Sequence, residues 1–105
     1  MNEFVIIGRA LGEVEPKTTD SGLMYAQMLL TVKKPFKNKD GEVDSETLQF
    51  TLFKNLAEEA SNIVKDGTAI IVKGHINANN YSKDGKITYR SDLIADRISI
   101  LDDLY

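Results

Sequence analysis

Hydrophobic and polar residues alternate in several short stretches of the chain, which is the pattern of strands buried on one face only. The clearest example runs from Met24 to Val32, where every second residue is apolar. Five stretches are typical of strands: one begins at Phe4, one at Ala69, and the others cover residues 24–32, 48–52 and 87–101. Turn-forming residues stand at 18–22, 40–41 and 84–85, and Asp-Gly pairs indicate hairpins. The pattern predicts an all-β protein.

The period changes to that of a helix between the third and fourth predicted strands. The apolar positions of this segment fall on one stripe: Leu56, Ala57, Ala60, Ile63 and Val64. Asn55 is a suitable N-cap, and Glu58, three residues later, is a suitable capping-box partner. Gly67 then ends the predicted helix.

The predicted order is strand, strand, strand, helix, strand, strand. Gly8 and Gly74 fall inside the first and fourth strands, where a glycine often marks a bulge or the bend of a barrel corner. A five-stranded Greek-key barrel of this kind is the OB-fold, whose strand faces and loops bind oligonucleotides. We therefore expect a five-stranded OB-fold barrel with one helix between strands three and four, with residues 1–105 forming a single domain.

The overall charge does not by itself favour a nucleic-acid ligand. Thirteen Lys and Arg oppose sixteen Asp and Glu, a net charge of −3, whereas nucleic-acid binders usually carry a positive balance. The absence of cysteine excludes disulfides, thiolate nucleophiles and Cys-based zinc sites. The first residues show no signal-peptide pattern, and no apolar run reaches the length of about eighteen residues that a membrane span needs. We expect a cytoplasmic protein without a membrane partner.

Catalysis is poorly supported by the sequence. His75 is the single histidine, and no Ser/His/Asp or metal-ligand spacing surrounds it. Four carboxylates alternate through the first hairpin, at Asp40, Glu42, Asp44 and Glu46. They lack the spacing of a calcium loop and are typical of a solvated hairpin face. We expect no enzymatic activity and no cofactor.

Two predicted hairpins combine aromatic rings with basic side chains, which is the combination that binds bare nucleic acid by stacking and phosphate contacts. In the first hairpin Phe36 stands among four lysines: Lys33, Lys34, Lys37 and Lys39. In the second, Tyr81 and Tyr89 stand beside three cations: Lys83, Lys86 and Arg90. Phe53 and Lys54 are a third candidate place. The alternatives are a solvated lysine cluster with Phe36 in the core, and a Phe53 ring that fills the core above the helix.

In the order and spacing of its motifs, the whole chain resembles the bacterial single-stranded DNA-binding protein (SSB) family. Five segments carry the likeness: Asn2 to Arg9 (N-x-V-x-L-I-G-R in the family), Thr19 to Gly22 (T-x-S/N-G), the aromatic hairpin Phe36 to Glu42, Phe53 to Glu58 (F-G-K-x-A-E), and Lys65 to Gly74 (L-x-K-G-x-x-V-x-V-x-G). Tyr81 occupies the family's aromatic position late in strand four.

The resemblance implies roles for individual residues. Phe36, Phe53 and Tyr81 match positions that stack on bases, and Lys37 and Lys54 beside them meet phosphates. It further implies that DNA wraps around the subunits with little sequence preference, in replication, recombination or repair. The implied assembly is a homotetramer built from dimers.

The chain departs from the family pattern at several positions. Thr47 stands at a fourth stacking position, and where the family usually presents arginines this chain has His75, Asn77, Asn79 and Asn80. Fewer neutralised phosphates predict weaker binding with a shallower salt dependence. The family's long linker and acidic tail are absent from the sequence, and residues 102–105 only faintly echo the tip of that tail. We expect them to be the end of the last strand.

Two alternatives remain within the same fold. A module similar to primosomal replication protein N is a tail-less dimer that bridges DNA and a helicase, and the short length and missing arginines favour it. An OB-fold subunit that binds proteins with weak or no DNA binding is favoured by the negative charge and the asparagine-rich fourth strand. Replication proteins are possible partners in either case.

Overall fold

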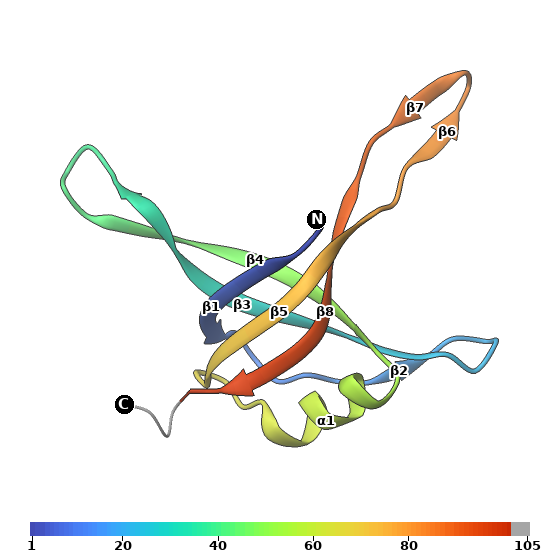
Figure 1. The fold of residues 1–105 in the computed structure, drawn as a ribbon, viewed down its shortest axis with the longest axis horizontal. Coiled ribbons are helices and arrows are strands. Elements are labelled where there is room, and N and C mark those ends of the chain that lie inside the picture. The colour runs from blue at the N-terminus through green and yellow to red at the C-terminus, as the bar shows by residue number, and fades with distance from the viewer. Residues whose placement is uncertain (102–105) are drawn as a thin grey trace.

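The computed structural model describes residues 1–101 and shows a small β-barrel with one helix. The barrel strands are β1 (Phe4–Ala10), β3 (Met24–Lys37), β4 (Val43–Phe53), β5 (Ala69–Ala78) and β8 (Ser91–Ile100), and the short strands are β2 (Lys17–Thr18), β6 (Tyr81–Lys83) and β7 (Lys86–Thr88). The helix α1 (Asn55–Ile63) lies between β4 and β5 and covers one end of the barrel (Figure 1). The predicted OB-fold order is confirmed. The expectation for residues 102–105 lies outside the described residues.

Barrel closure depends on pairings between strands far apart in the sequence. The hydrogen-bonded order is β1-β5-β8-β4-β3-β2, and β1 also pairs with β3 through Arg9 and Ala10. All of these barrel pairs are antiparallel except β4 with β8, which are parallel. The open ends of the sheet are thereby joined, which removes most exposed strand edges.

The barrel interior is built by the alternation seen in the sequence. On β3 the inward residues Ala26, Met28 and Leu30 are fully buried, and the register sets Ala26 opposite Leu52 and Met28 opposite Phe50. Because side chains on a strand alternate between faces, the residues between them lie on the outer face of the barrel. That outer face carries the candidate site.

Both glycines predicted to bend strands lie where backbones approach closely. A Cβ on Gly8 would stand 2.7 Å from the carbonyl oxygen of Thr31, and a Cβ on Gly74 would stand 1.9 Å from that of Ile94. The β5–β8 register shifts between Lys73 and Gly74, as at a β-bulge. Glycine is needed here because no side chain fits.

The helix has the predicted apolar stripe but not the predicted ends. Asn55 is the first helical residue, so the predicted N-cap is wrong. Lys54 takes that position with a φ of 56° and no side-chain cap, and no capping box forms with Glu58. The chain turns directly from β4 into the helix, and the Lys54 backbone N–H donates to the carbonyl of Met24. The helix ends at Ile63, so Gly67 (φ 84°) belongs to the following turn and does not end the helix.

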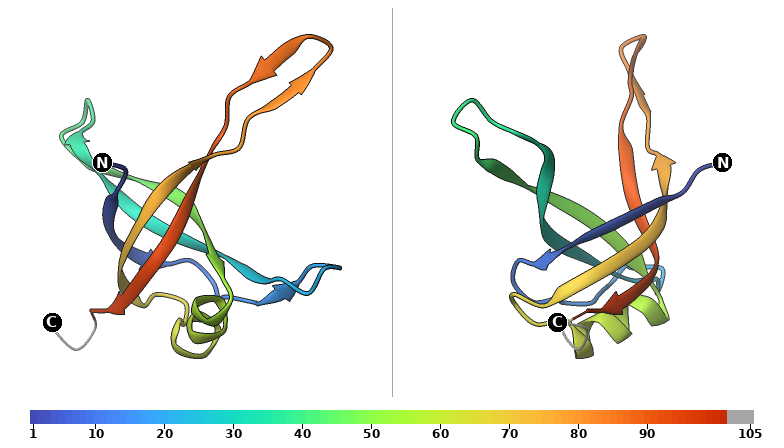
Figure 2. Two further views of the ribbon diagram at one scale, coloured as in Figure 1. Left: turned by 45° about the vertical axis from the view of Figure 1, so that its right-hand side comes forward. Right: turned by 60° about the vertical axis from the view of Figure 1, so that its left-hand side comes forward.

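Two hairpins extend beyond the barrel. We call residues 33–46, the outer part of β3–β4, arm 1, and residues 79–90, which include β6 and β7, arm 2. Both project away from the end covered by α1 (Figures 1 and 2). Asp84 and Gly85 both have positive φ, as a type I′ turn requires, which confirms the predicted turn. The predicted last strand is divided at Tyr89 and Arg90 into β7 and β8.

Within the described residues no helix has the length and apolar character that crossing a membrane requires.

Candidate nucleic-acid interface

Arm 1 presents an aromatic ring among lysines. Phe36 is 78% exposed, so the alternative that placed it in the core is wrong. Lys33, Lys34, Lys37 and Lys39 are exposed along the same arm. The β3–β4 register is irregular between Lys33 and Lys37, where four residues on β3 correspond to two on β4. Such a bulge increases local twist and re-aims side chains.

The carboxylates of arm 1 are solvated, as predicted. All four residues are exposed, and the one polar contact among their side chains joins Asp44 Oδ1 to Nδ2 of Asn38 at 3.0 Å, within the described chain. The Oδ1 atom of Asn38 in turn accepts from the backbone N–H groups of Asp40 and Glu42. These bonds hold the loop in shape. Asp40 and Glu42 therefore belong to a turn held by Asn38, and Asp44 and Glu46 belong to β4.

Arm 2 holds Tyr81 under an arginine. The Arg90 guanidinium carbon lies 5.4 Å from the centroid of the Tyr81 ring, which is 47% exposed. The backbone N–H of Arg90 donates to Oδ1 of Asn80 at 3.1 Å, and its carbonyl accepts from the N–H of Asn79. Arg90 therefore positions the ring through a cation–π contact. Asn79 and Asn80, noted as replacements for arginines, build the base of the arm.

Other side chains of arm 2 complete its exposed surface. Lys83 and Lys86 face each other across the turn. Tyr89, which the sequence analysis grouped with these cations, is 76% exposed. It therefore presents a second ring on arm 2.

A continuous outer face joins Phe53 to arm 1. The β3–β4 register sets Tyr25 opposite Phe53, Thr31 opposite Thr47, and Lys33 opposite Ser45. Because every second residue shares a face, Phe53, Thr47 and Lys33 lie on the same side of the ladder. Phe53 is 38% exposed and is not part of the core cluster, so it does not fill the core above the helix. Lys54, also exposed, follows it at the start of α1.

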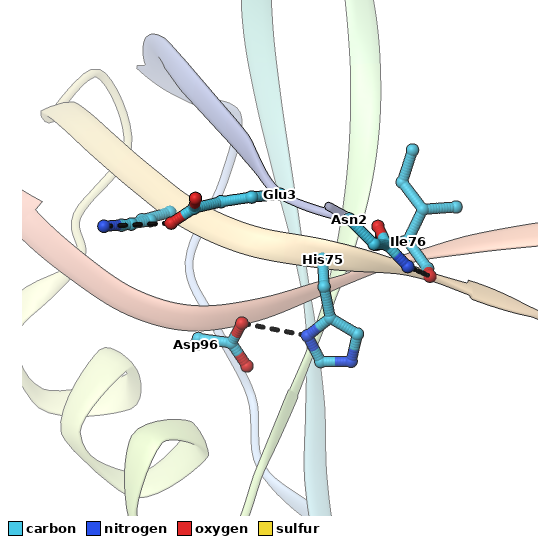
Figure 3. Close-up of polar contacts among 6 residues, drawn as sticks. Asn2, Glu3, His75, Ile76 and Asp96 are labelled. Atoms are coloured by element: carbon cyan, nitrogen blue, oxygen red, sulfur yellow. Dashed lines mark hydrogen bonds and ion pairs between the residues drawn. The ribbon is translucent and has the colours of Figure 1, made fainter.

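Beside Phe53 lies a groove of about 530 Å³ that crosses β4, β8 and β5. Its polar lining consists of Thr51, His75, Asn77, Asp92 and Asp96. His75 Nδ1 lies 2.9 Å from Oδ2 of Asp96 (Figure 3). Among residues 1–101 no cluster of His, Cys, Asp and Glu could hold a metal ion.

The first residues of the chain are tied to β5 next to this groove. The amide of Asn2 donates to the carbonyl of Ile76 at 2.6 Å and accepts from its N–H at 2.8 Å. Lys73 forms an ion pair with Glu3 at 3.0 Å (Figure 3). The paired amide bonds extend the β1–β5 ladder by a side chain and steady the strand that carries His75.

Comparisons with known proteins give a consistent result. The profile described as the single-strand binding protein family matches residues 1–101. Single-stranded DNA-binding protein 3 of Listeria innocua is 32% identical over 97% of this chain and 64% of its own length. Single-stranded DNA-binding protein 1 of Streptococcus pyogenes is 33% identical over 97% of this chain and 79% of its own. The chain thus spans about two thirds to four fifths of these relatives.

Among solved structures, the fold is similar to a deletion mutant of the single-stranded DNA binding protein from Thermus aquaticus. The TM-score is 0.77 at 21% identity, over 97% of this chain and 51% of that one. At this identity the likeness concerns the fold.

Proposed function

The chain belongs to the single-strand binding protein family, and from that premise we propose that it binds single-stranded DNA without marked sequence specificity, as a binding protein and not as an enzyme. The observation that carries this proposal is the placement of the rings. Phe36 and Tyr81 are exposed on separate arms. Phe53 lies on the outer face of β4, at the end of that strand next to α1. Exposed rings beside cations are stacking platforms for bases.

The two arms carry a small positive net charge of +2, although the whole chain carries −3. The arms carry seven of the thirteen cations: Lys33, Lys34, Lys37, Lys39, Lys83, Lys86 and Arg90. Three carboxylates, Glu58, Glu59 and Asp66, lie on α1 or just after it, at the end of the barrel away from the arms. Glu13 and Glu15 line a groove with Gln49 on the outer face of β3 and β4. Arm 1 itself is balanced, with four lysines and four carboxylates, so its contribution to phosphate binding is modest.

We propose that the strand of DNA follows the outer face of β4 from Phe53 to arm 1. Phe53 lies eight positions along β4 from Ser45, which is a path of about 26 Å. The outward residues of β4 on this path are hydroxyl and amide side chains: Ser45, Thr47, Gln49 and Thr51. These side chains are uncharged, but Glu13 and Glu15 line the same groove as Gln49 and weaken phosphate binding at that point. Lys54 at one end and Lys33 at the other supply the cations.

We further propose that the protein acts as a homo-oligomer in the cytoplasm, in DNA replication, recombination or repair. Val5 and Ile7 project from the outer face of β1 and are exposed, which is an apolar stripe that a second copy would cover. Light scattering distinguishes the homotetramer of the main proposal from the dimer expected of a module similar to primosomal replication protein N.

Titration of fluorescent oligo-dT at increasing salt tests the main proposal. We expect binding at low micromolar protein or better in low salt, with a shallow dependence of log K on log salt. The eight candidate cations (the seven on the arms and Lys54), each releasing about 0.7 counterion, limit the slope to a magnitude of about 6. The balanced charge of arm 1 predicts a slope clearly below this limit. Absence of binding in low salt contradicts the proposal.

Replacing Thr47 by tryptophan should strengthen binding. Thr47 is exposed on the same face as Phe53, near the arm 1 end of the proposed path. A ring there adds a stacking platform, and stacking contributes about 1–3 kcal/mol per base. We expect Kd for oligo-dT to fall about fivefold or more. Since the chain has no natural tryptophan, quenching of the new fluorescence reports DNA at this position directly.

Thr18→Trp is the matched control for this gain. Thr18 is exposed on β2, away from both arms (Figure 1). Its ring should neither change Kd nor be quenched. If Thr47→Trp behaves in the same way as Thr18→Trp, DNA does not follow the outer face of β4.

A further inference from the structure

His75 stands beside the proposed DNA path with one of its ring nitrogens held in place. It lies on the outer face of β5 and lines the groove next to Phe53. The β5–β8 register shifts between Lys73 and Gly74, and Asp96 is the residue of β8 left without a partner at this bulge. A bulge re-aims side chains, and here Oδ2 of Asp96 lies 2.9 Å from Nδ1 of His75 (Figure 3). A carboxylate therefore orients the ring at the edge of the candidate interface.

The bond to Asp96 decides where the ring gains a second proton. An ionised carboxylate can only accept, so Nδ1 of the neutral ring carries the proton and Nε2 is an acceptor. Protonation adds a positive charge, with the new N–H on Nε2, the nitrogen that is not bonded to Asp96. The side chains of His75 and Asp96 are 41% and 56% exposed, so the ring exchanges protons with water. His75 thus changes from an acceptor to a cationic donor while its bond to Asp96 is kept.

The charged groups that surround His75 leave its groove negative. Asp92 and Asp96 of β8 line it, and the described lining residues from β4 and α1 are uncharged: Thr51, Phe53 and Leu56. Lys73, two residues before His75 on β5, is paired with Glu3 at 3.0 Å. Arg97 stands opposite Lys73, on the far side of the bulge from the groove.

The protonation of one ring halves the negative charge of this part of the path. Two aspartates with a neutral histidine give the groove a charge of −2, and the same aspartates with a protonated histidine give −1. A strand stacked on Phe53 has phosphates close to this groove. Their repulsion by the two carboxylates is therefore weaker when His75 is protonated.

We propose that His75 is a further DNA-binding residue whose charge follows the pH, so that single-stranded DNA binds more tightly when the ring is protonated. The inference rests on the proposed function, because it needs DNA to follow the outer face of β4 past Phe53. The composition makes the assignment specific. His75 is the single histidine and cysteine is absent, and histidine is the side chain that ordinarily changes charge between about pH 5 and pH 8. The α-amino group is the other group that titrates in this range.

The test measures Kd for oligo-dT of about ten nucleotides, which is within the site size of an OB-fold, from about pH 8 to about pH 5.5 at constant low salt. Thymine has no group that titrates in this range. The protonated form binds more tightly, so we expect Kd to fall about threefold to tenfold as the pH is lowered. Because one histidine takes up one proton, the slope of log Kd against pH should not exceed about one. Higher salt should reduce the dependence by screening the phosphates.

Two substitutions fix the charge of this side chain and serve as controls for each other. His75→Gln stays neutral, so at every pH it should bind about as the wild type does near pH 8. His75→Lys stays charged, so at every pH it should bind at least as tightly as the wild type does near pH 5.5. Both variants should therefore lose most of the pH dependence, from opposite ends. Circular dichroism melts at both ends of the pH range establish that the variants are folded.

The possible failures are distinguishable. If oligo-dT binds at no pH, the proposed function itself is wrong. If the wild type binds oligo-dT equally across the range, or if His75→Gln keeps the wild-type pH dependence, DNA binding stands and the role of His75 is overturned. A wild-type Tm that changes with pH while Kd does not also overturns it, because the pair with Asp96 then acts on stability alone.

Discussion

Replacing Gly74 by alanine should lower the free energy of unfolding by about 3 kcal/mol or more. The added Cβ would stand 1.9 Å from the carbonyl oxygen of Ile94 and 2.8 Å from Cζ of Phe4. The first contact is with backbone, which cannot move without breaking the β5–β8 ladder. For a domain of this size the loss corresponds to a fall in Tm of roughly 12–24 °C. Circular dichroism melts at one fixed protein concentration measure it.

Gly12→Ala is the control that separates steric clash from the general cost of replacing a glycine. Gly12 has a φ of 81°, and a Cβ there meets nothing within 4 Å. Its substitution should cost only the strain of a left-handed backbone, about 1 kcal/mol. If the Tm of the Gly74→Ala variant lies within a few degrees of the Tm of the Gly12→Ala variant, the close approach of β5 and β8 at Gly74 is wrong.

A double variant that lacks the rings of Phe36 and Tyr81 should lose DNA affinity. The factor of that loss should equal the product of the factors measured for the two single variants. Phe36→Ala and Tyr81→Ala should each weaken binding by about 1–3 kcal/mol if the rings stack on bases. Phe36 and Tyr81 belong to separate arms, which diverge from each other (Figure 2), and distant sites are usually additive. We therefore expect the double variant to lose about 2–6 kcal/mol, or roughly 30-fold to 10⁴-fold in Kd. Fluorescence anisotropy with oligo-dT at low salt measures this loss.

Substitutions of exposed aliphatic side chains on the same arms provide the control. Val43 on arm 1 and Ile87 on arm 2 are exposed and have no π face. Val43→Ala and Ile87→Ala should leave Kd within about twofold, and all variants should keep the wild-type Tm, because surface changes rarely exceed about 0.5 kcal/mol. Unchanged affinity in the double ring variant, with the fold intact, contradicts stacking on the arms.

Local sequence patterns predicted most of the fold because they report local physics. The alternation from Met24 to Val32 places every second residue on one face whatever the strand pairs with, and the buried residues of β3 follow it. Asp84-Gly85 predicts a tight turn because both residues tolerate positive φ. The sequence pattern places the N-cap of the helix at Asn55 instead of Lys54, because the conformation of Lys54 depends on a contact with a distant residue. Lys54 adopts its φ of 56° where its N–H bonds Met24, thirty residues away in sequence.

Candidate residues for the site were predicted from the sequence, but their arrangement was not. A hairpin containing Phe36 or Tyr81 among cations is visible in the sequence, and family resemblance suggests their roles. Whether Phe36 lies in the core or outside depends on where the barrel ends and arm 1 begins. The contact of Arg90 with Tyr81 likewise depends on the twist and closure of arm 2.

The sequence by itself determined an all-β barrel with one helix, its turns, and rings standing among cations in two hairpins, because these depend on backbone preferences and on the period of nearby residues. Only the tertiary structure decided which rings are exposed, and only it brought Phe53, His75 and Asp92 to one groove. These residues come from β4, β5 and β8, whose parallel and antiparallel pairings are set by barrel closure. Closure is a long-range property of packing that no local period encodes.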